Sequence, residues 1–199
     1  MELKKIVITG GPCAGKTSAL AVLKAYFSEK GYNVLIVNET ATQLISGGVS
    51  AKSLGSDEKF QRLVMELQLK KEEIYLKAAK AMNKDKTLII YDRGTVDNRA
   101  YLSADEYEKL LRDENKTIDE LLSYYDAVIH LVTAADKAES FYTTENNRAR
   151  TETPEEARQR DKKIIEAWSR HKSFHIIDNS TDFEGKLRRI TEAIEKLIS

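Results

Sequence analysis

The sequence has few of the residues that cross-link or interrupt a chain. Of its 199 residues, one is cysteine and two are proline. A single cysteine, Cys13, cannot form an internal disulfide, which excludes a disulfide-stabilised secreted scaffold and agrees with a reducing compartment. Stability must then come from a packed core, and a chain of this length is expected to form one domain that buries such a core, spanning residues 1–199.

The sequence also lacks an excess of charge of one sign. Its 32 Lys and Arg residues balance 32 Asp and Glu residues, so the formal net charge is zero. Nucleic acids and anionic membranes attract excess positive charge, so neither is expected as a bulk partner. No apolar run approaches the roughly 20 residues that cross a bilayer, and the first residues enter a strand without a signal sequence. We therefore expect a cytoplasmic protein with no stable membrane insertion.

One glycine-containing motif dominates what is present. Residues 10–17 read GGPCAGKT and fit G-x-x-x-x-G-K-[ST], the phosphate-binding P-loop. An apolar, β-branched segment at residues 4–9 precedes it, and apolar residues at helical spacing follow it, which is the strand–loop–helix context that the motif requires. Its predicted nucleotide-binding residues are Gly10, Gly11, Pro12, Cys13, Ala14, Gly15, Lys16, Thr17 and Ser18.

The residue types of this loop suit a nucleoside triphosphate with Mg²⁺. Glycines permit backbone torsions that let N–H groups converge on phosphate oxygens, and the positive end of the following helix supports the same anion. Lys16 is expected at the β- and γ-phosphates, and the Thr17 hydroxyl is expected to bind Mg²⁺. The motif does not distinguish ATP from GTP.

Strands and helices alternate along the rest of the chain. Helix caps are predicted at Ser56, at Ser103 with Glu106, at Thr117 with Glu120, and at Thr153. A long helix should run from Ser56 to about Met82, and its buried apolar face is expected to include Leu63 and Ile74. Residues 46–55 are predicted to form a loop. This alternation predicts a three-layer α/β domain with a five-stranded parallel sheet. The strands are predicted at residues 4–9, 33–38, 87–91, 127–132 and 174–177.

Asp92 and Arg93 follow the third predicted strand. An aspartate that ends an apolar strand downstream of a P-loop is typical of a Walker B residue, which holds Mg²⁺ opposite Thr17. This role works best if the third strand lies beside the first, giving strand order 2-3-1-4-5. Motor ATPases usually place a glutamate after this aspartate, whereas Arg93 resembles the strand-end arginine of nucleoside and nucleotide kinases, which stabilises phosphate charge.

Other polar residues are expected at the same sheet edge. Glu39 ends the second strand, so Glu39 and Asp92 are alternative candidates for the catalytic base. Asp97 and Tyr101 either line an acceptor pocket or serve the core. Asn179, after the fifth strand, is predicted to contact the nucleotide base. An irregular segment that is typical of a kinase lid is placed at about residues 141–160 and contains Arg148 and Arg150. We expect Arg150 to reach the transferring phosphate. The following Arg158 and Arg160 are expected to be solvated or paired with nearby glutamates.

Several segments together resemble a known family. TGGPCAGKTS, VNETAT, YDRGTVDNRAY, YDAVIHLVTAA, FYTTENN-x-x-R-x-E and AWSRHKSFHIIDN occur in this order over nearly the whole chain. They resemble the AAA-like P-loop domain shared by the nicotinamide-riboside kinase part of NadR-type NAD regulators and by TRPL-translocation-defect-type proteins. The resemblance implies a nucleoside-kinase-like fold and nucleotide binding, and it leaves the reaction open, since the second group is described as binding GTP and phosphoinositides.

Two functions therefore remain. The first is a kinase that uses Mg²⁺ and ATP or GTP to phosphorylate a small hydroxylated acceptor, such as a nucleoside or ribosyl compound, with Lys16, Glu39, Asp92, Arg93 and Arg150 at the reaction centre. The second is a nucleotide-dependent switch with slow hydrolysis and a protein or phosphoinositide partner. An acceptor pocket between Glu39, Asp97 and residues 46–55 is expected of the kinase and is not needed by the switch.

Overall fold

The computed structural model describes residues 2–136 and 153–198. Five parallel strands form one sheet in the order β2-β3-β1-β4-β5, as the sequence predicted. Reading across the sheet, the strands are β2 (Asn33–Val37), β3 (Lys86–Asp92), β1 (Glu2–Gly10), β4 (Ala127–Leu131) and β5 (Phe174–Ile177). In the central strand, the successive side chains of Ile6, Val7 and Ile8 are all buried, which is the pattern of a strand covered on both faces.

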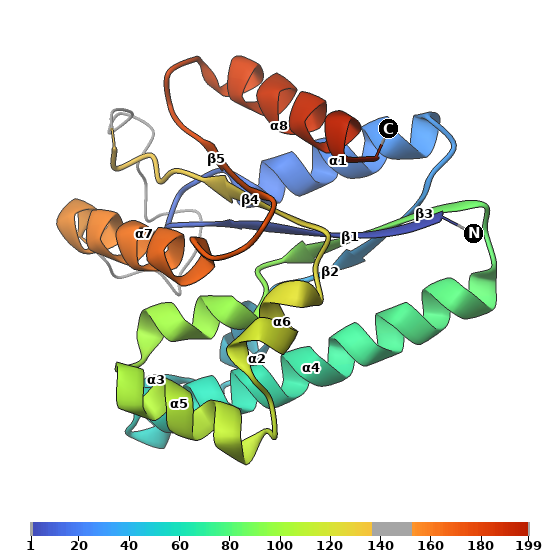
Figure 1. The fold of residues 1–199 in the computed structure, drawn as a ribbon. Helices are drawn as coiled ribbons and strands as arrows, with labels where there is room; N and C mark the ends of the chain where they lie inside the picture. The colour runs from blue at the N-terminus through green and yellow to red at the C-terminus, as the bar shows by residue number, and fades with distance from the viewer. Residues whose placement is uncertain (1, 137–152, 199) are drawn as a thin grey trace.

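Helices cover both faces of the sheet (Figure 1). One layer consists of α1 (Lys16–Glu29) and α8 (Phe183–Ile198), whose apolar stripes pack against one face. The opposite face is covered chiefly by α4 (Asp57–Met82) and α7 (Pro154–Trp168). The shorter elements on that side are α2 (Thr40–Ser46), α3 (Ala51–Leu54), the 3₁₀ helix η1 (Thr95–Tyr101), α5 (Ala104–Asp113) and α6 (Ile118–Ser123). The three-layer α/β class is confirmed.

The predicted helix caps form as local chemistry dictates. The hydroxyls of Ser56, Ser103, Thr117 and Thr153 each accept a hydrogen bond from the backbone N–H three residues later. In the last three, the glutamate at that later position bonds back to the cap residue, completing a capping box. These caps fix where four helices begin, and Pro154 occupies the first position of α7, where a missing N–H costs nothing.

Two local predictions were wrong. Residues 46–55 are not a continuous loop, because Ser50 and Ser53 form a capping box that starts α3, and Gly55 ends it in the left-handed conformation. On α4, Leu63 and Ile74 were expected in the core but are 37% and 51% exposed, whereas the polar side chains of Gln61, Gln68 and Glu72 are buried. Helix α4 therefore presents a buried polar stripe beneath the edge of the sheet.

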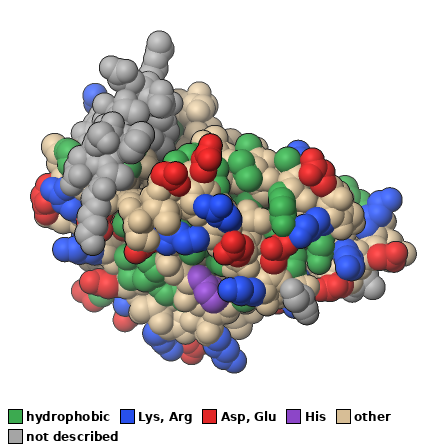
Figure 2. Space-filling view, turned by 90° about the horizontal axis from the view of Figure 1, so that it is seen from above, with side chains coloured by type: hydrophobic (Ala, Val, Ile, Leu, Met, Phe, Trp, Pro, Cys, Tyr) green, Lys and Arg blue, Asp and Glu red, His purple; other side chains and the backbone are tan. Residues whose placement is uncertain are grey.

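The outer face of the α1 and α8 layer carries charges of both signs. On the face formed by α1 and α8, acidic and basic side chains are interspersed (Figure 2), in agreement with the balanced composition. None of the helices within residues 2–136 and 153–198 is long and apolar enough to cross a membrane.

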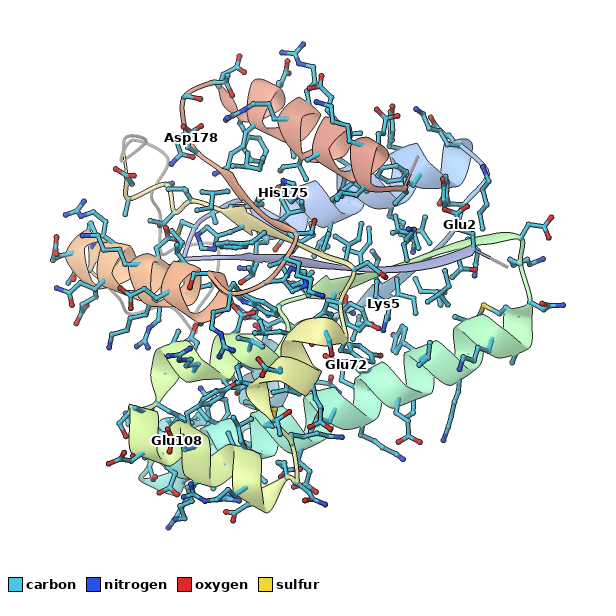
Figure 3. The ribbon with its side chains drawn as sticks, viewed as in Figure 1. Glu2, Lys5, Glu72, Glu108, His175 and Asp178 are labelled. Atoms are coloured by element: carbon cyan, nitrogen blue, oxygen red, sulfur yellow. The ribbon has the colours of Figure 1, made fainter. Side chains whose placement is uncertain are left out.

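The most deeply buried carboxyl of the polar stripe on α4 belongs to Glu72, which lies between α4 and the sheet (Figure 3). Burial raises its pKa from 4.5 to about 7, although Tyr125 and Gln68 donate hydrogen bonds that oppose the shift. Between pH 4.5 and about pH 7, the folded protein holds a proton on Glu72 that the unfolded chain has released. The unfolding free energy therefore falls as pH rises through this range. At about 1.4 kcal/mol per pH unit, the loss reaches about 3 kcal/mol near neutral pH.

We expect Glu72→Gln to remove most of this loss, because the amide cannot ionise. Urea unfolding at about pH 5 and about pH 8 measures the difference. Glu73→Gln is the matched control, since Glu73 is exposed and its hydrogen bonds to Lys70 and Lys77 lower its pKa to about 2, so its charge does not change in this range. Equal pH dependence in wild type and Glu72→Gln would contradict the buried, protonated state.

Candidate functional site

The loop between β1 and α1 has the backbone conformation of a phosphate cradle. Gly10 and Gly15 have φ of 154° and 86°, and Cys13 also lies in the left-handed region with φ of 57°. A Cβ on Gly15 would lie 2.6 Å from Cε2 of Phe183, so both torsion and space require glycine there. Lys16 is buried at the start of α1, while Thr17 and Ser18 are exposed. This arrangement places backbone N–H groups, one lysine and one hydroxyl together for an anion.

Asp161 of α7 holds this loop in place. Its Oδ1 accepts hydrogen bonds from the backbone N–H of Gly11 at 2.7 Å and of Thr133 at 3.3 Å, and lies 3.1 Å from Nε2 of His130. The Thr133 hydroxyl in turn donates to the carbonyl oxygen of Pro12 at 2.5 Å. A buried carboxylate with three partners is well compensated. It ties the P-loop to β4 and α7, a role that the sequence analysis did not assign to it.

Asp92 lies at the end of β3, directly beside Ile8 of β1. Its Oδ1 is buried and has no hydrogen-bond partner among the described residues. Burial raises its pKa, and the nearby positive charge of Lys16 opposes that shift. A buried, unpartnered carboxylate oxygen beside a phosphate loop fits a divalent cation. No group of three or more His, Cys, Asp and Glu side chains that could hold a metal ion occurs in the described part of the chain.

Arg93 is fixed by both its backbone and its guanidinium. Its φ is 68°, in the left-handed region that non-glycine residues rarely adopt. Its N–H donates to the carbonyl oxygen of Ile8, and its own carbonyl accepts from Gln68, each at 3.0 Å. Nε donates to Oε1 of Glu39 at 2.5 Å and Nη1 to Oδ1 of Asp97 at 3.2 Å. The largely buried guanidinium therefore joins the ends of β2 and β3 to η1.

The two partners of Arg93 are held differently. Burial acts to raise the pKa of Glu39, but the charges of Arg93 and Lys16 and the 2.6 Å hydrogen bond from the Thr42 hydroxyl lower it to about 2. Glu39 is thus an ionised acceptor at neutral pH. Asp97 also accepts from Thr9, from the N–H of Gly94 and from Nε1 of Trp168, so its oxygens mainly organise the site.

A cavity of about 500 Å³ opens beside these residues. Its walls come from the P-loop, α2, α3, α4, η1 and α7, on the same side of β1 as β2 and β3. Glu39, Asp97 and residues 50–52 all line it, so the pocket expected between these segments is present. The lining residues used below are Lys16, Glu39, Phe60, Gln61, Arg93, Asn98, Tyr101 and Arg160.

The sequence analysis did not predict that three polar residues line this cavity. Gln61 is 95% buried, and its amide bonds no other described residue. Oδ1 of Asn98 is likewise buried without a partner in residues 2–136 and 153–198. Arg160 was expected to be solvated, but it lies 4.2 Å from the ring centroid of Tyr101 and donates to the carbonyl oxygen of Ala100. A signal existed for Arg160, which falls beside the buried stripe of Ala157 and Ile164.

The remaining predicted site residues stand as follows. Arg158 pairs with Glu155 at 2.9 Å, as expected. The Nδ2 of Asn179 donates to the carbonyl oxygens of Thr133 and Asp136, at 2.8 and 2.7 Å, and its Oδ1 accepts from Lys186. Contact of Asn179 with a base stays a prediction, although its amide is already engaged. Arg148, Arg150 and most of the predicted lid lie outside the described residues.

Comparison with protein families places the chain by its sequence. A family model described as an AAA domain matches residues 5–186, which is nearly the whole chain and includes every element of the site described above. No curated protein matches the sequence.

The hydrogen bonds of Asp161 predict a specific loss. Asp161→Ala leaves the buried N–H groups of Gly11 and Thr133 without an acceptor, and each costs about 1–3 kcal/mol of unfolding free energy. We also expect weaker nucleotide binding, because the loop loses its anchor. Asp161→Asn is the control, since its amide oxygen can still accept at the same place. Urea unfolding and calorimetric titration with Mg²⁺–ATP measure both effects, and equal losses in the two variants would contradict the anchoring role.

Proposed function

The chain belongs to the AAA-domain family of P-loop NTPase-type proteins, and we propose that it is a kinase that transfers the γ-phosphate of a Mg²⁺-bound nucleoside triphosphate to a small hydroxylated acceptor, such as a nucleoside or ribosyl compound. The observation that carries the proposal is the cavity of about 500 Å³ beside Lys16. Its volume is that of a small-molecule site. A nucleotide switch or simple hydrolase needs room only for water at this place.

The donor side of the reaction is assigned to the P-loop. Its N–H groups and Lys16 bind the phosphates, while Thr17 and the unpartnered oxygen of Asp92 would hold Mg²⁺. When bound, the ion neutralises charge on the β- and γ-oxygens. Arg93 supplies a positive charge between the P-loop and the cavity, and its two carboxylate partners keep it in one orientation.

Glu39 is assigned to the acceptor hydroxyl. It lines the cavity and is ionised at neutral pH, so it can accept a hydrogen bond from the hydroxyl and aim its oxygen at the γ-phosphate. A carboxylate with so low a pKa is a weak proton acceptor, which suits phosphoryl transfer, because this reaction depends mainly on positioning and charge stabilisation. Asp92, committed to the metal, is then not the base. The proposal therefore assigns the orienting role to Glu39 and the metal to Asp92.

The amides that line the cavity indicate a polar acceptor. Gln61 is a buried residue of the cavity wall, and Oδ1 of Asn98 is buried there without a partner among the described residues. Leaving such a group unpaired is costly. Phe60, Tyr101 and neighbouring apolar residues supply flat or apolar wall beside them. An acceptor with both hydroxyl or amide groups and an apolar face complements this lining, as a ribosyl compound does.

Turnover with an acceptor panel tests the function. We expect nucleotide consumption with Mg²⁺–ATP or Mg²⁺–GTP to depend on one member of a panel of nucleosides and ribosyl metabolites, and to vanish in Lys16→Ala. Product phosphorylation is measured directly by mass. Tight nucleotide binding with slow hydrolysis that ignores every acceptor would instead favour the switch.

Gln61→Met tests the acceptor assignment, because it preserves size and removes the amide. Losing one neutral hydrogen bond should lower kcat/KM for the acceptor by about tenfold. The dissociation constant of the nucleotide, measured by calorimetry, should not change, since Gln61 lies on the cavity side of the loop. A loss of nucleotide affinity equal to the loss of kcat/KM would show instead that the variant disturbs the whole site.

A further inference from the structure

The position of the cavity determines the direction in which the donor nucleotide lies. Glu39 follows β2 and Arg93 follows β3, so the acceptor side is the β2–β3 side of the central strand. The γ-phosphate must face that side at Lys16. The rest of the nucleotide then leaves the P-loop on the other side, toward β4, β5 and the start of α8. Asp178 marks this region, on the opposite face of the sheet from Glu72 (Figure 3).

Polar side chains in that region are occupied by one another. The Asn179 amide bonds two carbonyl oxygens and Lys186, as described above. Lys186 also donates to the carbonyl oxygen of Val132 at 2.8 Å. Asp178 accepts from the Ser180 hydroxyl at 2.6 Å and from Arg189 at 2.7 Å. Asp182 accepts from the N–H of Gly185 at 2.8 Å. Each of these four groups therefore has at least one structural partner within the protein.

Phe183, in the same region, is apolar and partly exposed. It begins α8 and its ring packs against Gly15 of the P-loop, where a Cβ would lie 2.6 Å from the ring. The side chain is nevertheless 44% exposed, one of the most exposed large apolar residues of the described chain. An aromatic ring that touches the phosphate loop on one side and solvent on the other offers a flat surface at the point where the nucleoside emerges.

We infer that Phe183 is the platform on which the base of the donor nucleotide stacks. The inference rests on the proposed nucleotide binding and deepens it. Stacking tolerates any base, because every base has a π-face. With stacking in place of hydrogen-bond readout, the donor site accepts ATP and GTP with similar affinity.

Binding measurements on Phe183→Ala test the platform without requiring turnover. Calorimetry is performed with Mg²⁺ complexes of ATP, GTP and tripolyphosphate, which carries the phosphates without a base. Loss of stacking should weaken ATP and GTP each by about 10- to 100-fold. The affinity for tripolyphosphate should change by less than about twofold, because this ligand has no base to stack on the ring. Phe183→Trp keeps an aromatic surface and should retain ATP and GTP affinity.

Distinct outcomes overturn distinct claims. If Phe183→Ala weakens the binding of tripolyphosphate as much as the binding of ATP, the ring only supports Gly15. Unchanged ATP affinity would place the base elsewhere. A wild-type preference for one purine of more than about tenfold, which is about 1.4 kcal/mol, would require hydrogen-bond readout and contradict the inference. Wild-type protein that binds none of the three ligands would overturn the proposed nucleotide site and the platform together, whereas binding without acceptor turnover would overturn the kinase alone.

Discussion

The site depends on the buried positive charge of Arg93. The Arg93 guanidinium is largely removed from water, and a buried charge is tolerated only when paired and hydrogen-bonded. Glu39 and Asp97 supply the pairing from two different elements, so the ends of β2 and β3 and the start of η1 must converge around it. The charge of Arg93 helps to keep Glu39 ionised, and Arg93 and its two partners form part of the cavity wall.

The strand order gives this charge its setting. With β3 beside β1, the backbone N–H of Arg93 bonds the β1 carbonyl of Ile8, and Asp92 lies next to the phosphate loop. The same order places β4 and β5 on the far side of the loop. In the proposed kinase reaction, the central strand therefore separates the donor region from the acceptor region, and the transferring phosphate lies where the two regions meet.

Much of this arrangement could be predicted from the sequence because the relevant signals are local. The P-loop, the five strands and the caps at Ser56, Ser103, Thr117 and Thr153 each depend on neighbouring residues, and the strand order followed from requiring Asp92 near Thr17. The residues whose roles the sequence did not predict depend on contacts between distant parts of the chain. Gln61 and Arg160 look like ordinary surface residues until tertiary packing encloses them, and Asp161 acts on a loop 150 positions away in the chain. Residues 46–55 were misjudged because Ser50 and Ser53 cap a helix of only four residues.

Helix α7 carries two of these residues side by side. Asp161 holds the backbone of the phosphate loop, while the adjacent Arg160 lies against Tyr101 in the wall of the acceptor cavity. A helix moves as a rigid unit, so a shift that improves one contact changes the other. Thermodynamic linkage then makes the effect reciprocal: whatever factor the donor imposes on acceptor affinity through α7, the acceptor imposes on the donor. In the proposed reaction, the affinities for donor and acceptor are thus coupled through two neighbouring positions on one helix whenever ligand binding displaces it.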